Sequence, residues 1–71
     1  MFYHWLKLMR PEILVRVEDV IDGILYAETV ENLLPIVEAD EDLKNACVYS
    51  WEEAVENGEP NYNDITVHIE I

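Results

Sequence analysis

The chain has 71 residues, 51% of them hydrophobic, which is enough for one small domain with a single core. Sixteen Asp and Glu against four Lys and Arg give a formal net charge of −12 at pH 7. This charge argues against direct binding to nucleic acid or to anionic membranes, and the single cysteine excludes an internal disulfide.

The first elements are predicted to be two antiparallel strands. Residues 2–9 (FYHWLKLM) are rich in aromatic side chains and lack a turn former, which favours a strand. Residues 10–12 contain Pro11 and predict a turn. Residues 13–20 alternate between apolar and polar side chains and predict the second strand. Its two faces are Ile13, Val15 and Val17 on one side and Arg16 and Glu18 on the other.

Residues 17–28 have two interpretations. Asp22-Gly23 is a strong hairpin dipeptide and would lead into a strand over residues 24–28. The apolar side chains also follow the spacing of an amphipathic helix. They are Val17, Val20, Ile21, Ile24 and Leu25. A glycine inside a helix costs about 1 kcal/mol relative to alanine. We therefore favour the hairpin and keep the helix as the alternative.

Two helical segments are predicted next. Thr29 can cap a helix that has Glu31 in its first turn. Pro35 would kink this helix or mark a later start. Asp40 can cap a further short turn that extends through Leu43. The apolar stripe of the first helix is Val30, Leu33, Leu34 and Val37.

A short strand is predicted over residues 46–49, and a third helix is predicted to follow it. Ser50 and Glu53 fit a capping box, which indicates a helix over residues 51–57. Gly58 is a suitable residue to end that helix.

The chain is predicted to finish with a loop and a strand. Residues 59–63 contain a proline and two asparagines, which favours a loop. Residues 64–71 (DITVHIEI) alternate cleanly and predict the last strand. We expect Ile65, Val67, Ile69 and Ile71 to face inward and Thr66, His68 and Glu70 to face outward.

Together these elements predict one α+β domain that spans residues 1–71. We expect a small antiparallel sheet of three to four strands with one or two short helices on one face.

The candidate chemistry points away from catalysis. His4 and His68 are the only histidines, too few for a zinc site. The acidic residues 40–42 lack the pattern of a calcium-binding loop. Cys47 has no evident partner base, so we expect it to be a small buried hydrophobic residue. We therefore predict a non-enzymatic protein with no cofactor and no metal.

No targeting or membrane segment is expected. The apolar stretch near the N-terminus is too short to span a bilayer, and it lacks the charged region and cleavage site of a signal peptide. A single free thiol fits a reducing compartment. The expected location is therefore the cytoplasm.

The charge is distributed unevenly along the chain. Residues 1–17 contain three of the four bases and one acid, a net of +2, whereas residues 18–71 contain fifteen acids and one base, a net of −14. We expect Arg16 to pair with a neighbouring carboxylate. Thirteen of these fifteen acids form four groups. These are Glu18, Asp19 and Asp22; Glu28 and Glu31; Glu38, Asp40, Glu41 and Asp42; and Glu52, Glu53, Glu56 and Glu59.

The last two groups are the candidate partner-binding residues. On the predicted helix, Glu52 and Glu56 would share a face one turn apart. Rows of carboxylates at such spacing approximate the phosphates of duplex DNA. The predicted site is therefore Glu38, Asp40, Glu41, Asp42, Glu52, Glu53, Glu56 and Glu59.

In size, charge and lack of catalytic motifs, the chain resembles the small acidic phage-encoded inhibitors, which include anti-CRISPR and antirestriction proteins of the DNA-mimic type. The resemblance implies an inhibitor in the host-cell cytoplasm that binds a basic protein surface, the nucleic-acid-binding site of a partner, without itself binding nucleic acid.

The alternative is a small protein–protein interaction module, such as an accessory subunit, an antitoxin-like protein or a homodimer, held mainly by apolar contacts. Phe2, Tyr3 and Trp5 would then be its anchors. A third interpretation is that the acidity serves solubility or adaptation to salt.

Overall fold

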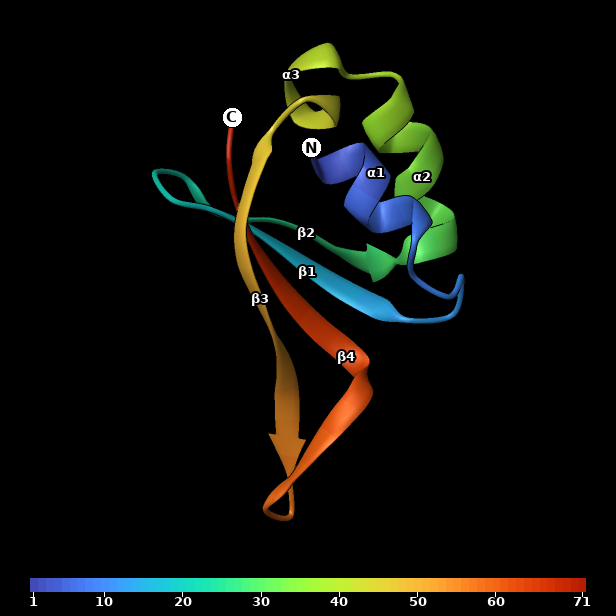
Figure 1. The fold of residues 1–71 in the computed structure, drawn as a ribbon, viewed down its shortest axis with the longest axis vertical. Coiled ribbons are helices and arrows are strands. Elements are labelled where there is room, and N and C mark those ends of the chain that lie inside the picture. The colour runs from blue at the N-terminus through green and yellow to red at the C-terminus, as the bar shows by residue number, and fades with distance from the viewer.

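The computed structural model describes all 71 residues. Four strands form one sheet in the order β2-β1-β4-β3, and the helices lie together on one face of it (Figure 1). In chain order the elements are α1 (Phe2–Lys7), β1 (Leu14–Asp19), β2 (Gly23–Thr29), α2 (Val30–Glu38), α3 (Glu41–Lys44), β3 (Cys47–Glu56) and β4 (Glu59–Glu70). The predicted α+β class is confirmed, with three short helices instead of one or two.

The sheet is mixed because its two hairpins join through their inner strands. Strand β1 is antiparallel to β2, and β3 is antiparallel to β4, but β1 and β4 run parallel. Helices α2 and α3 produce this arrangement, since they return the chain to the end of the sheet at which β2 began. The prediction of a purely antiparallel sheet was therefore wrong for the central pair.

The N-terminal segment is a helix and not the predicted strand. Phe2, Trp5 and Leu6 follow helical spacing, and all three are buried. Their single apolar face packs onto the core, which outweighs the β-propensity of aromatic residues. The Phe2 amide donates to the carbonyl of Ala46 at 2.9 Å and so fixes the start of the helix beside β3. The predicted turn at Pro11 is confirmed.

The hairpin interpretation of residues 17–28 is confirmed. Strand β1 ends at Asp19, and β2 begins at Gly23, whose positive φ of 78° suits glycine. The predicted faces of β1 are also confirmed. Ile13, Val15 and Val17 are buried, whereas Arg16 is exposed and Glu18 is partly exposed.

Helices α2 and α3 begin at the predicted caps. The Thr29 hydroxyl accepts a hydrogen bond from the Asn32 amide at 3.3 Å. The Asp40 carboxylate accepts from the amides of Asp42 and Leu43 at 3.1 and 3.2 Å. Pro35 lies inside α2 and does not delay its start. No helix in the structure has the length and apolar character needed to cross a membrane.

The largest difference from the sequence analysis lies in residues 50–63. The predicted helix over 51–57 and loop over 59–63 are parts of the long hairpin formed by β3 and β4. Asn57 and Gly58 have φ values of 52° and 81°, the left-handed geometry of a two-residue hairpin turn. Asn-Gly is the favoured sequence for that turn. The predicted helix would have only seven residues, and an isolated helix of that length is unstable in water. The hydrogen-bonded pairing of β3 with β4 is therefore favoured.

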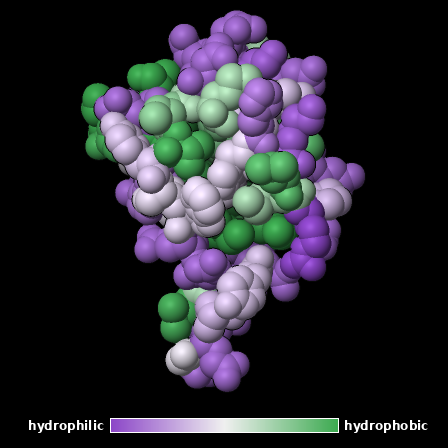
Figure 2. Space-filling model, in the orientation of Figure 1, coloured by the Kyte–Doolittle hydropathy of each residue, from purple (hydrophilic) through white to green (hydrophobic).

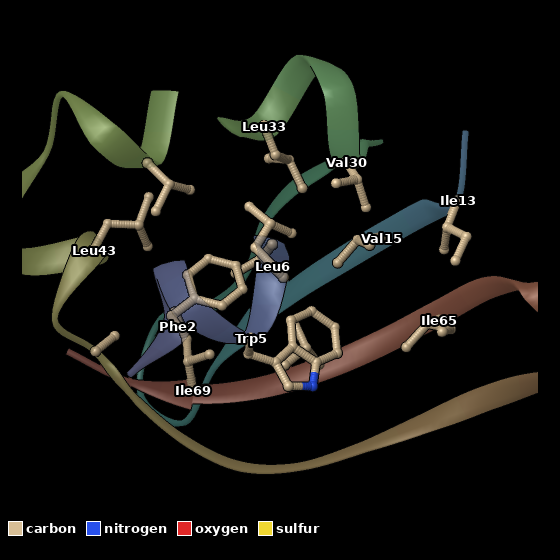
Figure 3. Close-up of a cluster of buried hydrophobic side chains, with 14 residues drawn as sticks. Phe2, Trp5, Leu6, Ile13, Val15, Val30, Leu33, Leu43, Ile65 and Ile69 are labelled. Atoms are coloured by element: carbon tan, nitrogen blue, oxygen red, sulfur yellow. The ribbon is translucent and has the colours of Figure 1, made fainter. Parts of the chain in front are cut away.

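The core lies between the helices and the inner face of the sheet (Figure 3). Ile65, Val67 and Ile69 of β4 face this core as predicted, but Ile71 is exposed. Cys47, expected to be buried, is also exposed. The fourteen buried hydrophobic residues are Phe2, Trp5, Leu6, Ile13, Val15, Val17, Val30, Leu33, Val37, Leu43, Ala46, Ile65, Val67 and Ile69.

Candidate partner-binding surface

The face of the sheet that the helices leave uncovered is strongly acidic. Side chains alternate along a strand, so the residues between the buried positions of β1 and β4 point to this open side. Arg16 is the only Lys or Arg in any of the four strands. By alternation and register, Glu18, Glu52, Asp64 and Glu70 lie on this face. The register of β3 with β4 shifts between Glu53 and Ala54, so Glu56 is placed here by alternation along β3, and Glu59 by its pairing with Glu56. We call these six acids the open-face acids.

Two polar networks cross the strands on the open face. His68 of β4 lies between two carboxylates, with Nε2 at 3.1 Å from Oε1 of Glu52 and Nδ1 at 3.9 Å from Oε1 of Glu18. The Arg16 guanidinium donates to Oδ2 of Asp64 at 2.9 Å, so the predicted pairing of Arg16 is confirmed. These contacts link β1, β4 and β3 and hold their carboxylates in place.

Beyond the start of β1, the hairpin of β3 and β4 projects alone as an arm (Figure 1). The ladder between β1 and β4 begins at Asp64, and the outer residues pair only within the hairpin. We define the arm as residues 54–63. Glu56 and Glu59 face each other directly across its tip. Like charges in this position are destabilising, and the amide of Asn61 offsets this in part by donating to Glu56 at 3.1 Å.

The carboxylates along the arm and its root lie in two groups. From Glu52 to Glu56 the chain rises about 13 Å, at about 3.3 Å per residue. Four open-face acids fall within this length: Glu52, Glu56, Glu59 and Asp64. Glu56 and Glu59 face each other at one end of this length, and Glu52 and Asp64 lie near the other end, where Asp64 is already paired with Arg16.

The eight acids predicted from the sequence do not form one surface. Glu52, Glu56 and Glu59 lie on the open face, but Glu53 pairs with the buried Ile65 and points to the side of the helices. The predicted helical spacing of Glu52 and Glu56 was wrong, because two β repeats place them on one face.

The other predicted group lies at the corner between α2 and α3, at the opposite end of the molecule from the arm tip (Figure 1). This corner consists of Glu38, Asp40, Glu41 and Asp42. The Asp40 carboxylate is already engaged as the cap of α3. We therefore separate the corner from the open face.

Three acids of the open face were not among the predicted site residues. The alternation of both strands places Glu18 and Glu70 on an outward face, and this signal is visible in the sequence. Asp64 was expected at the start of the last strand, but nothing local indicated that it would meet Arg16. The missing information was the parallel pairing of β1 with β4.

The Glu70 carboxylate also changes the acidity of Tyr49. A hydrogen bond to the Glu70 carboxylate raises the pKa of Tyr49 above its ordinary value of 10.0, and burial and the nearby negative charge add to this. The structure contains no pocket and no group of three or more side chains suited to hold a metal ion.

Comparisons with protein-family models, with curated proteins and with solved structures each found no match. The proposals below therefore rest on the residues and their geometry.

Proposed function

We propose that this protein is a non-enzymatic inhibitor that occupies a positively charged, nucleic-acid-binding site of a partner protein, in the manner of DNA-mimic phage inhibitors such as anti-CRISPR proteins. The observation that carries the proposal is the open face, where six carboxylates gather and the only Arg of the sheet is already paired with Asp64. A Lys- or Arg-rich groove is the complement of such a surface.

Most of the acidic charge has no basic partner within the molecule. Only Arg10 with Glu12 and Arg16 with Asp64 form Lys/Arg–carboxylate pairs within 4.0 Å. Fourteen of the sixteen acids therefore lack a Lys or Arg partner. Charge left uncompensated in this way creates a field that accelerates encounter with a basic surface.

The shape of the arm suits a groove. The molecule measures 37 × 25 × 16 Å along its principal axes, and the arm forms one end of the long axis (Figure 1). The arm is two strands wide, and neighbouring strands lie about 5 Å apart. The arm is narrower than the rest of the molecule, so it is the part best suited to enter a groove (Figure 1).

The test is displacement of nucleic acid. The immobilised protein is used at low salt to capture its partner from the cell of origin, and the captured partner is then loaded with a labelled DNA or RNA. We expect the free protein to release the label. The triple variant Glu52→Lys, Glu56→Lys, Glu59→Lys should not release it at the same concentration.

A matched control separates the open face from total charge. The variant Glu38→Lys, Glu41→Lys, Asp42→Lys changes the net charge by the same amount at the far corner and spares the cap Asp40. This control should still release the label. A partner that binds no nucleic acid, or one that keeps its nucleic acid when saturated with this protein, would contradict the proposal.

The second candidate function is an interaction module held mainly by apolar contacts. Of the three expected anchors, Phe2 and Trp5 are buried in the core, and Tyr3 is partly buried against it. The candidate is instead favoured by exposed apolar side chains around the turn between β1 and β2, of which Ile21 is 83% exposed. It predicts an affinity for the partner that changes little between low and high salt.

A further inference from the structure

We propose that the end of the sheet opposite the arm is a docking surface for a partner segment that combines apolar side chains with Lys or Arg. The proposal rests on the proposed function in that it expects a basic partner, but it concerns different residues. We call this surface the apolar end. It consists of Val20, Ile21, Ile24, Tyr49 and Ile71.

The topology places these five residues at the same end of the sheet, spread across its four strands. Because β1 and β4 are parallel, both strands finish at this end, and Val20 and Ile71 follow them directly. Strands β2 and β3 begin here and contribute Ile24 and Tyr49. All five side chains are more than half exposed. Figure 2 shows hydrophobic surface on the side where the β1–β2 turn and the C-terminus lie in Figure 1.

One buried carboxylate fixes the backbone of the apolar end. Oδ2 of Asp19 accepts from the amides of Ile21 and Asp22 at 3.0 and 3.1 Å, and Oδ1 accepts from the amide of Ile71 at 3.4 Å. The Val20 amide donates to the carbonyl of Ile69 at 3.1 Å. The exposed side chains are thus presented on a preorganised backbone, which lowers the entropic cost of binding.

Carboxylates surround the apolar side chains. Glu18 pairs with Ile24 across β1 and β2, Asp22 lies in the turn, and Glu70 bonds to Tyr49. Residues 17–43 and 45–71 contain no Lys or Arg, and the Lys44 ammonium lies over the ring of Tyr3, 5.4 Å from its centroid. An apolar centre with an acidic rim complements a segment whose apolar side chains are flanked by Lys or Arg.

The same charges disfavour a second copy as the occupant. Each chain carries a net charge of −12, and self-association through the apolar end would bring the acidic rims of two copies together. Like charges brought together across an interface oppose association. The continuity of the apolar end with the open face, through Glu18 and Glu70, lets one basic partner contact both surfaces.

The test uses two synthetic peptides as probes. The first has three leucines flanked on both sides by lysines, and in the second the leucines are replaced by serines. We expect the leucine peptide to shift the backbone amide NMR signals of residues 18–24 and 69–71. Its binding should be about tenfold tighter than that of the serine peptide, since the apolar contacts are lost in the latter.

Two exposed residues give a matched pair of variants. Ile21→Ser removes an apolar side chain that is 83% exposed, and Leu8→Ser removes one that is 82% exposed at the end of α1. Because both sites are solvent-exposed, both variants should stay folded. Ile21→Ser should weaken binding of the leucine peptide about tenfold, whereas Leu8→Ser should leave it unchanged.

Three outcomes would overturn the proposal. In one, both peptides bind equally; in another, both variants bind like the wild type; in the third, sedimentation shows a wild-type dimer that Ile21→Ser dissociates. The variant Glu52→Lys, Glu56→Lys, Glu59→Lys distinguishes this proposal from the proposed function. It should keep the leucine-peptide shifts at the apolar end even though it no longer displaces nucleic acid.

Discussion

Asp19 is the residue on which the end of the sheet depends most. It is the only buried charged residue, 5% exposed, and its two oxygens accept three backbone hydrogen bonds. The bonds from Asp22 and Ile21, followed by that from Ile71, lower the pKa of Asp19 below its ordinary value of 3.8, and desolvation opposes them only in part. The folded state therefore favours the ionised carboxylate.

This shift predicts how stability changes in acid. A lowered folded pKa means that the contribution of Asp19 is complete above pH 4 or so and is lost as the pH falls through the folded value. Asp19→Asn should reduce the free energy of unfolding at pH 7. The difference from wild type should shrink as the pH falls from about 4 towards the lowered folded pKa, because the unfolded chain then binds a proton that the native carboxylate does not.

Urea unfolding of both proteins at a series of pH values measures this difference. A gap that stays constant down to the lowest pH at which both proteins fold would show that charge on Asp19 does not stabilise the turn.

Substitution of Phe2 tests whether the N-terminal segment is a helix that packs on the core. Phe2 is fully buried between the helices and the sheet (Figure 3), so Phe2→Ala should lower the free energy of unfolding by about 3–5 kcal/mol. Leu8→Ala, on an exposed residue of the same segment, should change it by less than about 0.5 kcal/mol. Urea denaturation measures both. Equal and small effects would mean that Phe2 is a surface anchor and not part of the core.

At the level of single residues, alternation predicted the strands well. The inward and outward positions of β1 and most of β4 followed directly from the sequence, because a strand with one buried face requires them. Cys47 and Ile71 were misplaced for a different reason. Both lie at strand ends, where no neighbouring element covers them, and only the fold reveals that.

At the level of elements, the errors occurred where two local signals compete. The helical spacing of Phe2, Trp5 and Leu6 competed with their β-propensity, and the Ser50–Glu53 capping box competed with the Asn57-Gly58 turn. Tertiary packing decided both cases. In contrast, α2 and α3 were correct because Thr29 and Asp40 cap them directly, and no competing turn signal was present.

The arm contains a repulsion between Glu56 and Glu59 that a single substitution removes. Glu56→Gln eliminates the charge directly opposite Glu59 and keeps an oxygen that can accept from Asn61. We therefore expect the free energy of unfolding to rise by about 0.2–1 kcal/mol at low salt. The gain should decrease as added salt screens the wild-type repulsion.

Thermal or urea unfolding at low and high salt checks this prediction. A loss of stability in Glu56→Gln would mean that the negative charge of Glu56 stabilises the arm, and its retention would then need no functional explanation.

At the scale of the whole molecule, the candidate surface depends on one long-range pairing. The open face exists as a continuous surface because β1 lies beside β4, and this brings Arg16 next to Asp64 and Glu18 next to His68. The two strands are about fifty residues apart in the chain, so no local pattern predicts their register. Composition did predict the acidity, which needs no knowledge of the fold.

The distribution of charge separates two explanations of that acidity. If the acids serve only solubility, their effect depends on net charge, and the site of a charge reversal is unimportant. If they bind a basic site, the open face matters and the α2–α3 corner does not. Two triple variants with the same net charge distinguish these cases. The open-face variant is Glu52→Lys, Glu56→Lys, Glu59→Lys. The corner variant is Glu38→Lys, Glu41→Lys, Asp42→Lys.

The most direct measurement is the affinity of the captured partner for the wild type and these two variants over a series of salt concentrations. We predict that the open-face variant binds at least about tenfold more weakly, a loss of about 1.4 kcal/mol, and with a flatter salt dependence. The corner variant should follow the wild-type curve. Equal losses in both variants, or no loss in either, would contradict the assignment of the open face as the binding surface.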